Sequence, residues 1–510
     1  MPLHHQPQTL KQCSLRVIAE NFEAICYNCR SVEEMDSLIE SGDYLNCKSN
    51  IYNIPSHLIA DLAEELKHIT HLRCHHLHTL ITPMLLEWNS DGISDQMMAF
   101  HLIKTRCEKL KHLNMGYVRH LNYKVFLNLL PSLNTLVMLD LRMTLTVDEI
   151  MGKIGEFCTQ LVDLNLSGTP ITDKGLIQLC VAENGTRKCQ KLVRLSVEET
   201  WVTSAGATVV LQSLPNLKDF DFENMFEALE QVEMWDQHIE SNLLSRAGLR
   251  MSEVPSKTPT QLKITSLIST TEFVREEAFE SAVRLCPDIT AISISNAWLS
   301  SESLYKFMVL EQLNKLSLTN SEGLTFDFHE GVLPLLSACG VRLQSLILAN
   351  FPVVDILAIG RACPILQNLA FSKVSIFELP SQLHPELFNN LEAMELWSET
   401  QIEINPNLVK QLLQFSPMIR NILFNGCSVL SDKLFDEIWE KNPMKKLSHI
   451  TLDHCHNVTM STLHDLLDKD NELNVLRVWS CASINKTHSL QISQRLMNEN
   501  MDIYFEWFSI

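Results

Sequence analysis

One apolar pattern recurs along most of this 510-residue chain and constrains its fold more than any other feature. The pattern is Leu-x-x-Leu-x-Leu, with other apolar residues at some of its three places, and it starts at Leu110, Leu136, Leu161, Leu192, Leu217, Ile289, Leu313, Leu343, Leu366, Leu391, Ile419, Leu447 and Leu473. Leaving aside the gap between Leu217 and Ile289, the starts are spaced nearly evenly, with the shortest step from Leu343 to Leu366 and the longest from Leu161 to Leu192. A leucine-rich repeat of about 20–29 residues supplies one strand and one returning segment, whose apolar faces are buried by neighbouring repeats. The pattern therefore predicts an α/β leucine-rich-repeat solenoid with parallel strands on the concave side and helices outside.

Cysteines follow the same period. Cys158 and Cys363 stand three residues before a repeat start, and Cys427 and Cys455 stand three residues after the last apolar place of a repeat. Because the 15 cysteines are spread along a chain without an export signal, we expect reduced, buried thiols. Together with Ile171-Thr-Asp-Lys-Gly-Leu176, these residues resemble the cysteine-containing repeats of F-box-type ubiquitin-ligase receptors over residues 105–480. The resemblance implies a protein-binding solenoid.

The repeats divide the chain into four predicted parts. Residues 1–104 form a small helical N-terminal capping or adaptor domain, 105–227 and 276–510 hold the repeats and a C-terminal cap, and 228–275 is an irregular insertion. One degenerate repeat is expected in the insertion, starting at Leu262, after an exposed loop over 251–259. Four aromatic residues in 503–510 predict a final strand that covers the last repeat.

An amphipathic helix is predicted near the N-terminus, with Leu10, Cys13 and Val17 along one side. This side either packs on its own domain, as a solenoid cap requires, or binds a partner. The helix resembles the box by which substrate receptors bind Elongin C, with Leu10 at the leucine place, Ser14 at the cysteine place and Ile18 at the aliphatic place. The resemblance implies that these three residues contact an adaptor.

A second motif stands at Ile54-Pro55, followed by Leu58 and Leu62. Pro55 suits the first turn of a helix, where Leu58 and Leu62 then share a face. The four residues resemble the cullin box of Elongin-dependent receptors of the zyg-eleven kind, and they also resemble the start of an F-box. Either resemblance implies a partner: Elongin C and a cullin, or a Skp-type adaptor.

Two clusters of potential metal ligands are weighed against structural roles. Cys26 and Cys29 are spaced like a zinc knuckle that Cys13 or Cys47 would complete, but a second pair is lacking. His71 and His75 are four apart within a histidine-rich stretch, with Glu64 and Glu65 as possible carboxylates. We expect buried cysteines and a histidine-rich capping helix, hence no metal, no cofactor and, without any catalytic motif, no enzyme.

The remaining function is binding at the concave face. Trp397 and Trp479 occupy the same place of their repeats, directly after the last apolar strand position, and exposed tryptophans are frequent binding anchors. Arg420 and Arg477 lie on nearby strands and are expected to hold a carboxylate of the bound protein. The alternative for each tryptophan is packing onto its neighbouring turn.

Charge and hydropathy narrow the class of partner. The net charge of −20, without a basic stripe, repels nucleic acid and anionic lipid, and no apolar stretch is long enough to span a membrane. We therefore expect a cytoplasmic or nuclear protein that binds proteins. The predicted function is the substrate receptor of a cullin-RING ubiquitin ligase, and the alternative is a repeat scaffold without ubiquitin machinery.

Overall fold

The computed structural model describes residues 9–509 apart from 28–30, 32, 36, 38–53, 119–122, 183, 235–260, 270–272, 296–298, 321–325, 381–383, 385 and 399–403. The chain divides into two compact units, one spanning Gln8–Ile264 and the other containing Thr265–Ile510. The loop expected over 251–259 lies outside the described residues. Among the described residues, no helix is long and apolar enough to cross a membrane.

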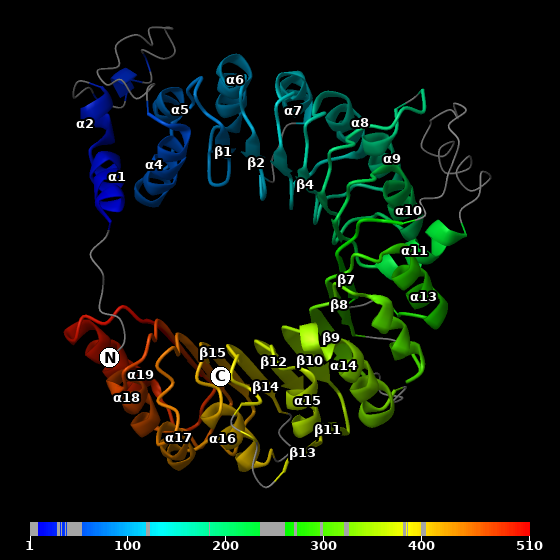
Figure 1. Ribbon diagram of the computed structural model, residues 1–510. Coiled ribbons are helices and arrows are strands. Elements are labelled where there is room, and N and C mark those ends of the chain that lie inside the picture. The colour runs from blue at the N-terminus through cyan, green and yellow to red at the C-terminus, as the bar shows by residue number, and fades with distance from the viewer. Residues whose placement is uncertain are drawn as a thin grey trace. The chain divides into compact units, whose positions relative to one another are not determined.

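The first unit contains a parallel sheet of six described strands in sequence order, with helices along one side (Figure 1). The strands are β1 (Glu87–Asn89), β2 (His112–Asn114), β3 (Met138–Asp140), β4 (Asp163–Asn165), β5 (Arg194–Ser196) and β6 (Asp219–Asp221). The helices are α1 (Leu10–Glu20), α2 (Phe22–Cys26), α4 (Ser56–Ile69), α5 (Cys74–Leu80), α6 (Gln96–Arg106), α7 (Tyr123–Leu129), η3 (Leu130–Ser132), α8 (Asp148–Phe157), α9 (Asp173–Cys180), α10 (Ser204–Ser213) and α11 (Met225–Glu233).

The second unit contains a parallel sheet of ten described strands and a two-stranded sheet of β11 and β13. The strands are β7 (Ser266–Ser269), β8 (Ala291–Ile294), β9 (Lys315–Thr319), β10 (Ser345–Ala349), β11 (Val353–Asp355), β12 (Asn368–Ser372), β13 (Ile376–Glu378), β14 (Ala393–Trp397), β15 (Asn421–Asn425), β16 (His449–Asp453), β17 (Val475–Trp479) and β18 (Tyr504–Phe508). The helices are α13 (Glu276–Leu285), η4 (Ser303–Val309), η5 (Phe328–Val332), α14 (Leu333–Cys339), η6 (Gly340–Arg342), α15 (Ile356–Ala362), α16 (Pro406–Gln414), α17 (Asp432–Trp439), α18 (Met460–Asp468) and α19 (Lys486–Asn498).

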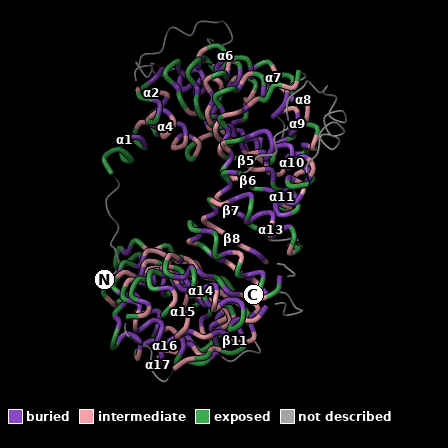
Figure 2. Tube along the Cα trace, turned by 45° about the vertical axis from the view of Figure 1, so that its right-hand side comes forward, coloured by how far each residue is buried: buried purple, intermediate pink, exposed green. Residues whose placement is uncertain are grey.

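The strand register confirms the leucine-rich-repeat solenoid. Within each of the two large sheets, neighbouring strands pair in parallel with one strand from each successive repeat, and the apolar places align, as Leu113 with Leu139 and Ile422 with Ile450 show. The side chains at these places are buried between the sheet and the helices, and buried residues occur throughout both units (Figure 2). Alternate strand residues point to the opposite sheet face, because side chains along a strand alternate.

Three local features differ from expectation. The sheet begins inside the region expected to be helical, because β1 pairs with β2 and Trp88 aligns with Leu113. The degenerate repeat starts at Ile264 and not at Leu262, because Leu267 aligns with Ile292. Between β8 and β9 the returning segment among the described residues is the 3₁₀ helix η4 and not an α-helix.

A final strand covers the last repeat, as the aromatic C-terminal segment predicts. β18 pairs in parallel with β17, so that Phe505 and Trp507 align with Leu476 and Val478. The Trp507 indole N–H donates to the carbonyl oxygen of Ile484 at 3.2 Å.

Most cysteines are buried, as their repeat positions predict. The thiols of Cys427, Cys455 and Cys481 each donate to a carbonyl oxygen on the strand of the preceding repeat, at sulfur–oxygen distances of 3.7, 3.6 and 3.5 Å. Burial raises the pKa of Cys158 and of Cys427 to about 12, so both remain protonated thiols at neutral pH. Cys13 is exposed and departs from this rule.

Candidate functional site

The N-terminal helix α1 is fixed by a capping box. The Thr9 hydroxyl accepts from the Gln12 backbone N–H at 3.2 Å, and the Gln12 side-chain oxygen accepts from the Thr9 backbone N–H at 2.9 Å. Leu15 and Ala19 are buried where α1 packs against α4. A salt bridge of 2.5 Å between Lys11 and Asp61 joins the same two helices.

The opposite side of α1 is exposed. Leu10 is 84% exposed and Val17 is 56% exposed, and Cys13 and Ser14 between them are exposed too. Ile18 is half-buried. The side expected to pack on its own domain or to bind a partner is therefore largely exposed, and the side that packs against α4 is the one carrying Leu15 and Ala19.

The second motif stands at the start of α4, and its apolar side chains are partly or fully buried within the unit. Pro55 is the N-cap residue, with φ −56° and ψ 143°, and therefore precedes the first helical turn in which we expected it. Ile54 and Leu58 are half-buried, but Leu62 is only 1% exposed and packs with Ile59 on the inner side of the helix. Leu62 is not available to an adaptor in this conformation.

The two tryptophans of the second unit stand in one row across the sheet. Trp397 aligns with Asn425, Asn425 with Asp453, and Asp453 with Trp479. Three strand spacings of about 4.8 Å separate the two tryptophans by about 14 Å. Trp397 is 42% exposed and Trp479 is half-buried, so both side chains are accessible on the sheet face opposite the helices.

Arg477 lies on β17 and Arg420 lies one residue before β15, and both arginines are already paired within the chain. Arg420 Nη1 lies 3.3 Å from Glu472 Oε2, and Arg477 Nε lies 3.1 Å from Glu506 Oε2. The Arg477 guanidinium also lies 5.9 Å from the ring centroids of Trp479 and Tyr504. A bound carboxylate would therefore compete with Glu472 or Glu506, or use the remaining N–H donors of each guanidinium.

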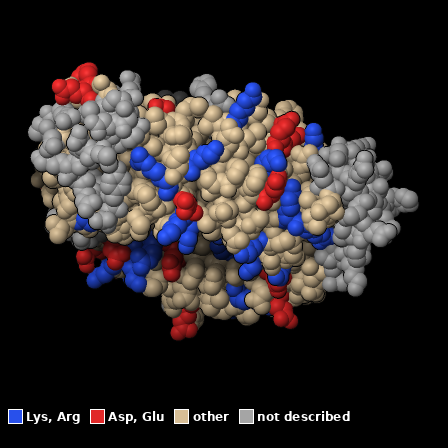
Figure 3. Space-filling model, turned by 90° about the horizontal axis from the view of Figure 1, so that it is seen from above, with Lys and Arg blue, Asp and Glu red and all other residues tan. Residues whose placement is uncertain are grey.

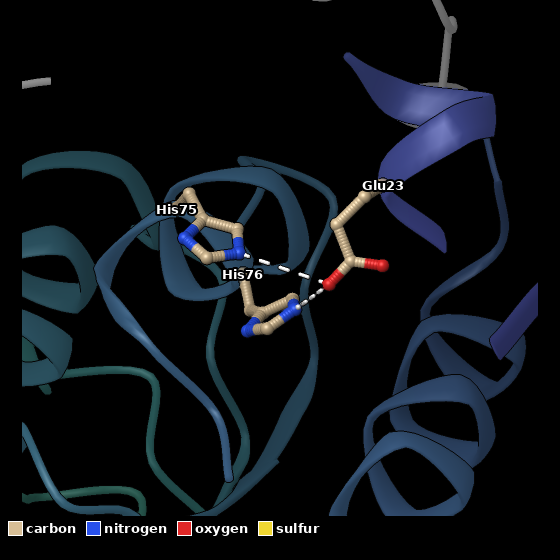
Figure 4. A group of neighbouring side chains, drawn as sticks. All are labelled: Glu23, His75 and His76. Atoms are coloured by element: carbon tan, nitrogen blue, oxygen red, sulfur yellow. Dashed lines mark hydrogen bonds and ion pairs between the residues drawn. The ribbon is translucent and has the colours of Figure 1, made fainter. Parts of the chain in front are cut away.

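A cluster of one half-buried carboxylate and two buried histidines joins α2 to α5 (Figure 4). His76 Nε2 lies 3.1 Å from Glu23 Oε1, and His75 Nε2 lies 4.0 Å from the same oxygen. The Tyr27 hydroxyl donates to the His75 carbonyl oxygen at 2.5 Å. Among the described residues, Glu23, His75 and His76 bring three potential metal ligands within 4.8 Å of one another.

Hydrogen bonding sets the tautomer of His76. The Arg73 backbone N–H donates to His76 Nδ1 at 3.0 Å, so a neutral ring carries its hydrogen on Nε2 and donates it to Glu23. A metal at Nε2 would need the lone pair that this hydrogen occupies. The geometry thus fits a carboxylate–histidine hydrogen bond better than a metal site.

Burial keeps His76 neutral at neutral pH. It lowers the pKa of His76 to about 4, with repulsion from His75 adding to the effect. Burial alone would raise the pKa of Glu23, but its backbone hydrogen bond and His76 outweigh burial, so this pKa is lowered. At neutral pH the pair is a neutral imidazole that donates to a carboxylate.

Of the two clusters of potential metal ligands weighed from the sequence, the histidine cluster is not assembled from the residues considered there, and the cysteine cluster lies partly outside the described residues. His71 is exposed and precedes α5, so it does not share a helix with His75. Glu64 pairs with Lys67 at 2.8 Å, and the carboxylate beside the histidines is Glu23. Of the proposed cysteine site, Cys26 is buried and Cys13 is exposed, while residues 29 and 47 lie outside the described part of the chain.

Several contacts could not be found by sequence reasoning. Glu23 and His76 lie far apart in the sequence, on α2 and α5, and no spacing rule connects them. Tyr504 contacts Arg477, and the only sequence signal for its position is the alternation of side chains that predicts the C-terminal strand.

Comparisons with known proteins give distant likeness in structure. No family model and no curated relative matches this chain. Among solved structures it is similar to chains in the crystal structure of Rad7 and Elc1 in yeast (14% identity, TM-score 0.43, 89% of this chain and 95% of that chain) and in a Leptospira interrogans LRR protein (16% identity, TM-score 0.37, 85% and 92%). It is also similar to a chain in a TLR13–ssRNA13 complex (14% identity, TM-score 0.31), of which it spans only 43%. At these low similarities the likeness does not extend to function.

Proposed function

We propose that this chain is a non-enzymatic leucine-rich-repeat subunit that binds proteins and serves as the substrate receptor of a cullin-RING ubiquitin ligase. The observation that carries the proposal is the exposed apolar side of α1, where Leu10 and Val17 project from a helix held by its own cap and by α4. Transferring a leucine from water into a protein pocket contributes about 1.5–3 kcal/mol. An adaptor that accepts Leu10 and the small Ser14 side chain would use this side.

The second part of the proposal concerns Pro55, Ile54 and Leu58. They begin α4, against which α1 packs, so they lie on the same two-helix element as Leu10. We propose that they extend the adaptor surface towards a cullin. Leu62 is left out of this surface because it is buried.

For the substrate we propose the sheet face around Trp397, Trp479, Arg420 and Arg477. The tryptophans supply accessible apolar surface, and the arginines supply charges that can exchange their internal carboxylates for external ones. A protein segment about 14 Å or more in length could contact both tryptophans at once.

The charge distribution favours a protein partner over nucleic acid. The net charge is −20, and on the face drawn in Figure 3 Lys and Arg side chains lie among Asp and Glu side chains without a broad patch of one sign. Binding to a phosphate backbone draws its affinity from clustered cations. We further propose a cytoplasmic or nuclear location, where cullin ligases act.

The test is binding of the purified full chain to purified Elongin B–Elongin C by calorimetry. We expect binding that Leu10→Ala weakens about tenfold or more, because the leucine side chain loses its pocket. Leu490→Ala is the matched control, since Leu490 is also a largely exposed helical leucine, on α19.

The outcomes separate the alternatives. Binding to a Skp-type adaptor in place of Elongin C would reassign the α1–α4 element to an F-box type. Failure to bind either adaptor, by a protein that melts cooperatively, would contradict the ligase proposal and leave a plain repeat scaffold.

A further inference from the structure

A row of exposed apolar side chains lies on the loops that follow β3, β4 and β5 in the first unit. Leu145, Pro170 and Trp201 occupy the same place in three consecutive repeats, four residues after the last apolar strand position of each. Leu145 is 63% exposed, Trp201 is 74% exposed, and Pro170 is exposed as well. Tyr117 and Met143 are exposed as well, on the loops after β2 and β3. We call these five residues the apolar rim.

The rim is held in place by repeated hydrogen bonds. The hydroxyls of Thr144, Thr169 and Thr200 each donate to the carbonyl oxygen three residues earlier, at 2.7, 2.5 and 2.7 Å. The Trp201 backbone N–H donates to the carbonyl oxygen of Ile171 at 3.0 Å, which fixes one loop against the next. The apolar side chains are therefore exposed on an ordered backbone.

The second residue after the last apolar strand position has a left-handed backbone in four successive repeats. Tyr117, Met143, Gly168 and Glu199 have φ of 62°, 56°, 66° and 53°. At Gly168 a Cβ would lie 2.5 Å from Met143 Sδ, so the methionine side chain covers this glycine. Because Gly168 has no side chain, the Met143 side chain can lie against its backbone.

Four carboxylates lie near the Trp201 end of the apolar rim. Glu198 and Glu199 precede Trp201 by three and two residues, and Asp221 and Glu223 follow on the neighbouring repeat. The Glu199 backbone N–H donates to Glu223 Oε1 at 3.4 Å, so the two repeats are in contact there. We call these four residues the acidic flank.

The acidic flank lacks internal counter-charges in the described part of the chain. No described Lys or Arg forms an ion pair with its four carboxylates, whereas neighbouring Asp163 pairs with Arg194 at 2.7 Å. Burial and repulsion from Asp221, Glu223 and Glu199 raise the pKa of Glu198. Burial and repulsion from Asp219 and Asp163 likewise raise the pKa of Asp221, although Ser196 opposes this by hydrogen bonding. An external cation would relieve this repulsion.

We propose that the apolar rim and the acidic flank form a docking surface for a partner-protein segment that carries an aromatic or aliphatic anchor next to Lys or Arg residues. The apolar rim matches the anchor and the unpaired carboxylates match the cations. Phosphate backbones and anionic lipids are excluded by the same carboxylates. The surface lies within the first unit, and it does not depend on the ligase proposal or on Trp397 and Trp479.

The test selects short peptides from a random phage-displayed library on the full chain, after counter-selection on the Trp201→Ala variant. We expect enriched peptides with net positive charge and at least one large apolar residue. Their affinity for the wild-type chain should fall about tenfold or more with Trp201→Ala, and also with Glu198→Gln combined with Glu223→Gln. It should also weaken when NaCl is raised, because salt screens exposed charges.

The controls separate docking from loss of fold. Trp201 is largely exposed, so Trp201→Ala should leave the melting temperature unchanged, and Leu490→Ala removes an exposed apolar side chain elsewhere without affecting peptide binding. Enriched peptides that are neutral or acidic, or that bind both variants as well as wild type, would overturn the proposal. So would the absence of any peptide that depends on Trp201.

Discussion

Asp432 links two repeats of the second unit through a single carboxylate. It lies in the first turn of α17, and its Oδ1 accepts from the Thr459 backbone N–H at 3.0 Å and from the Thr462 hydroxyl at 2.5 Å. Its Oδ2 accepts from the Thr459 hydroxyl at 2.7 Å. Thr459 is the N-cap residue of α18, so the Asp432 carboxylate accepts hydrogen bonds from the residue at which the next helix begins. Asp148 and Asp173 repeat this arrangement in the first unit.

We expect Asp432→Ala to destabilise the α17–α18 region. A hydrogen bond to a charged group contributes about 1.5–3 kcal/mol, but water can replace part of it at this partly exposed site. We therefore expect a loss of about 2 kcal/mol, which corresponds to a roughly thirtyfold larger opening constant. Hydrogen–deuterium exchange of the full chain at pH 7 should show this increase in peptides that cover α17 and α18.

The pH dependence of this effect has a defined sign. Burial would raise the pKa of Asp432, but the hydrogen bonds from Thr462 and Thr459 outweigh it, and the pKa falls below its ordinary value of 3.8. The stabilisation by Asp432 is therefore complete above pH 3.8, and it is lost as the pH falls through the lowered pKa of the folded state. The difference in melting temperature between wild type and variant should shrink over that range.

Asp436→Ala is the control, because Asp436 is an exposed acid on the same helix. If Asp432→Ala speeds exchange no more than Asp436→Ala, the carboxylate bridge does not hold the two repeats together and this reasoning is wrong.

Three further predictions test single positions. Gly426→Ala should cost about 2 kcal/mol or more in urea unfolding, because φ is +69° and the new Cβ would clash with the Ser398 carbonyl oxygen. Unchanged stability would contradict the backbone geometry. Glu198→Gln should raise the melting temperature at pH 7, because the folded state raises this pKa, and the gain should vanish as the pH falls below its ordinary value of 4.5. Glu23→Leu should cost about 1–3 kcal/mol by leaving the buried His76 N–H without its acceptor. Zinc or a chelator should leave the wild-type melting temperature unchanged, and a zinc-dependent rise would restore the metal interpretation.

The strands could be predicted because their signal is local. Three apolar places within one short segment set which strand side chains point to the core, and the nearly constant repeat length brings successive strands into register. Even β1 had such a signal: Leu85 stands one repeat length before Leu110, and Trp88 fills the second place. This signal is weak because tryptophan and serine stand at the second and third places, where most other repeats have aliphatic residues or phenylalanine.

Exposure could not be predicted from the same spacing. Leu10 and Leu15 lie on one short helix, yet α4 buries Leu15 and leaves Leu10 in solvent. Likewise, the sequence indicates that Arg477 lies on the accessible sheet face, but only the fold brings Glu506 and Tyr504 beside it.

The sequence by itself therefore determined the solenoid, the place of its repeats and the buried side of each strand, since these depend on residues close together in the chain. The tertiary structure alone decided which apolar side chains remain uncovered and which charges remain unpaired. Both properties depend on neighbours from other repeats. Trp201 is exposed because no later segment of the described chain covers it. Glu198 is unpaired because no described segment brings a cation to its carboxylate.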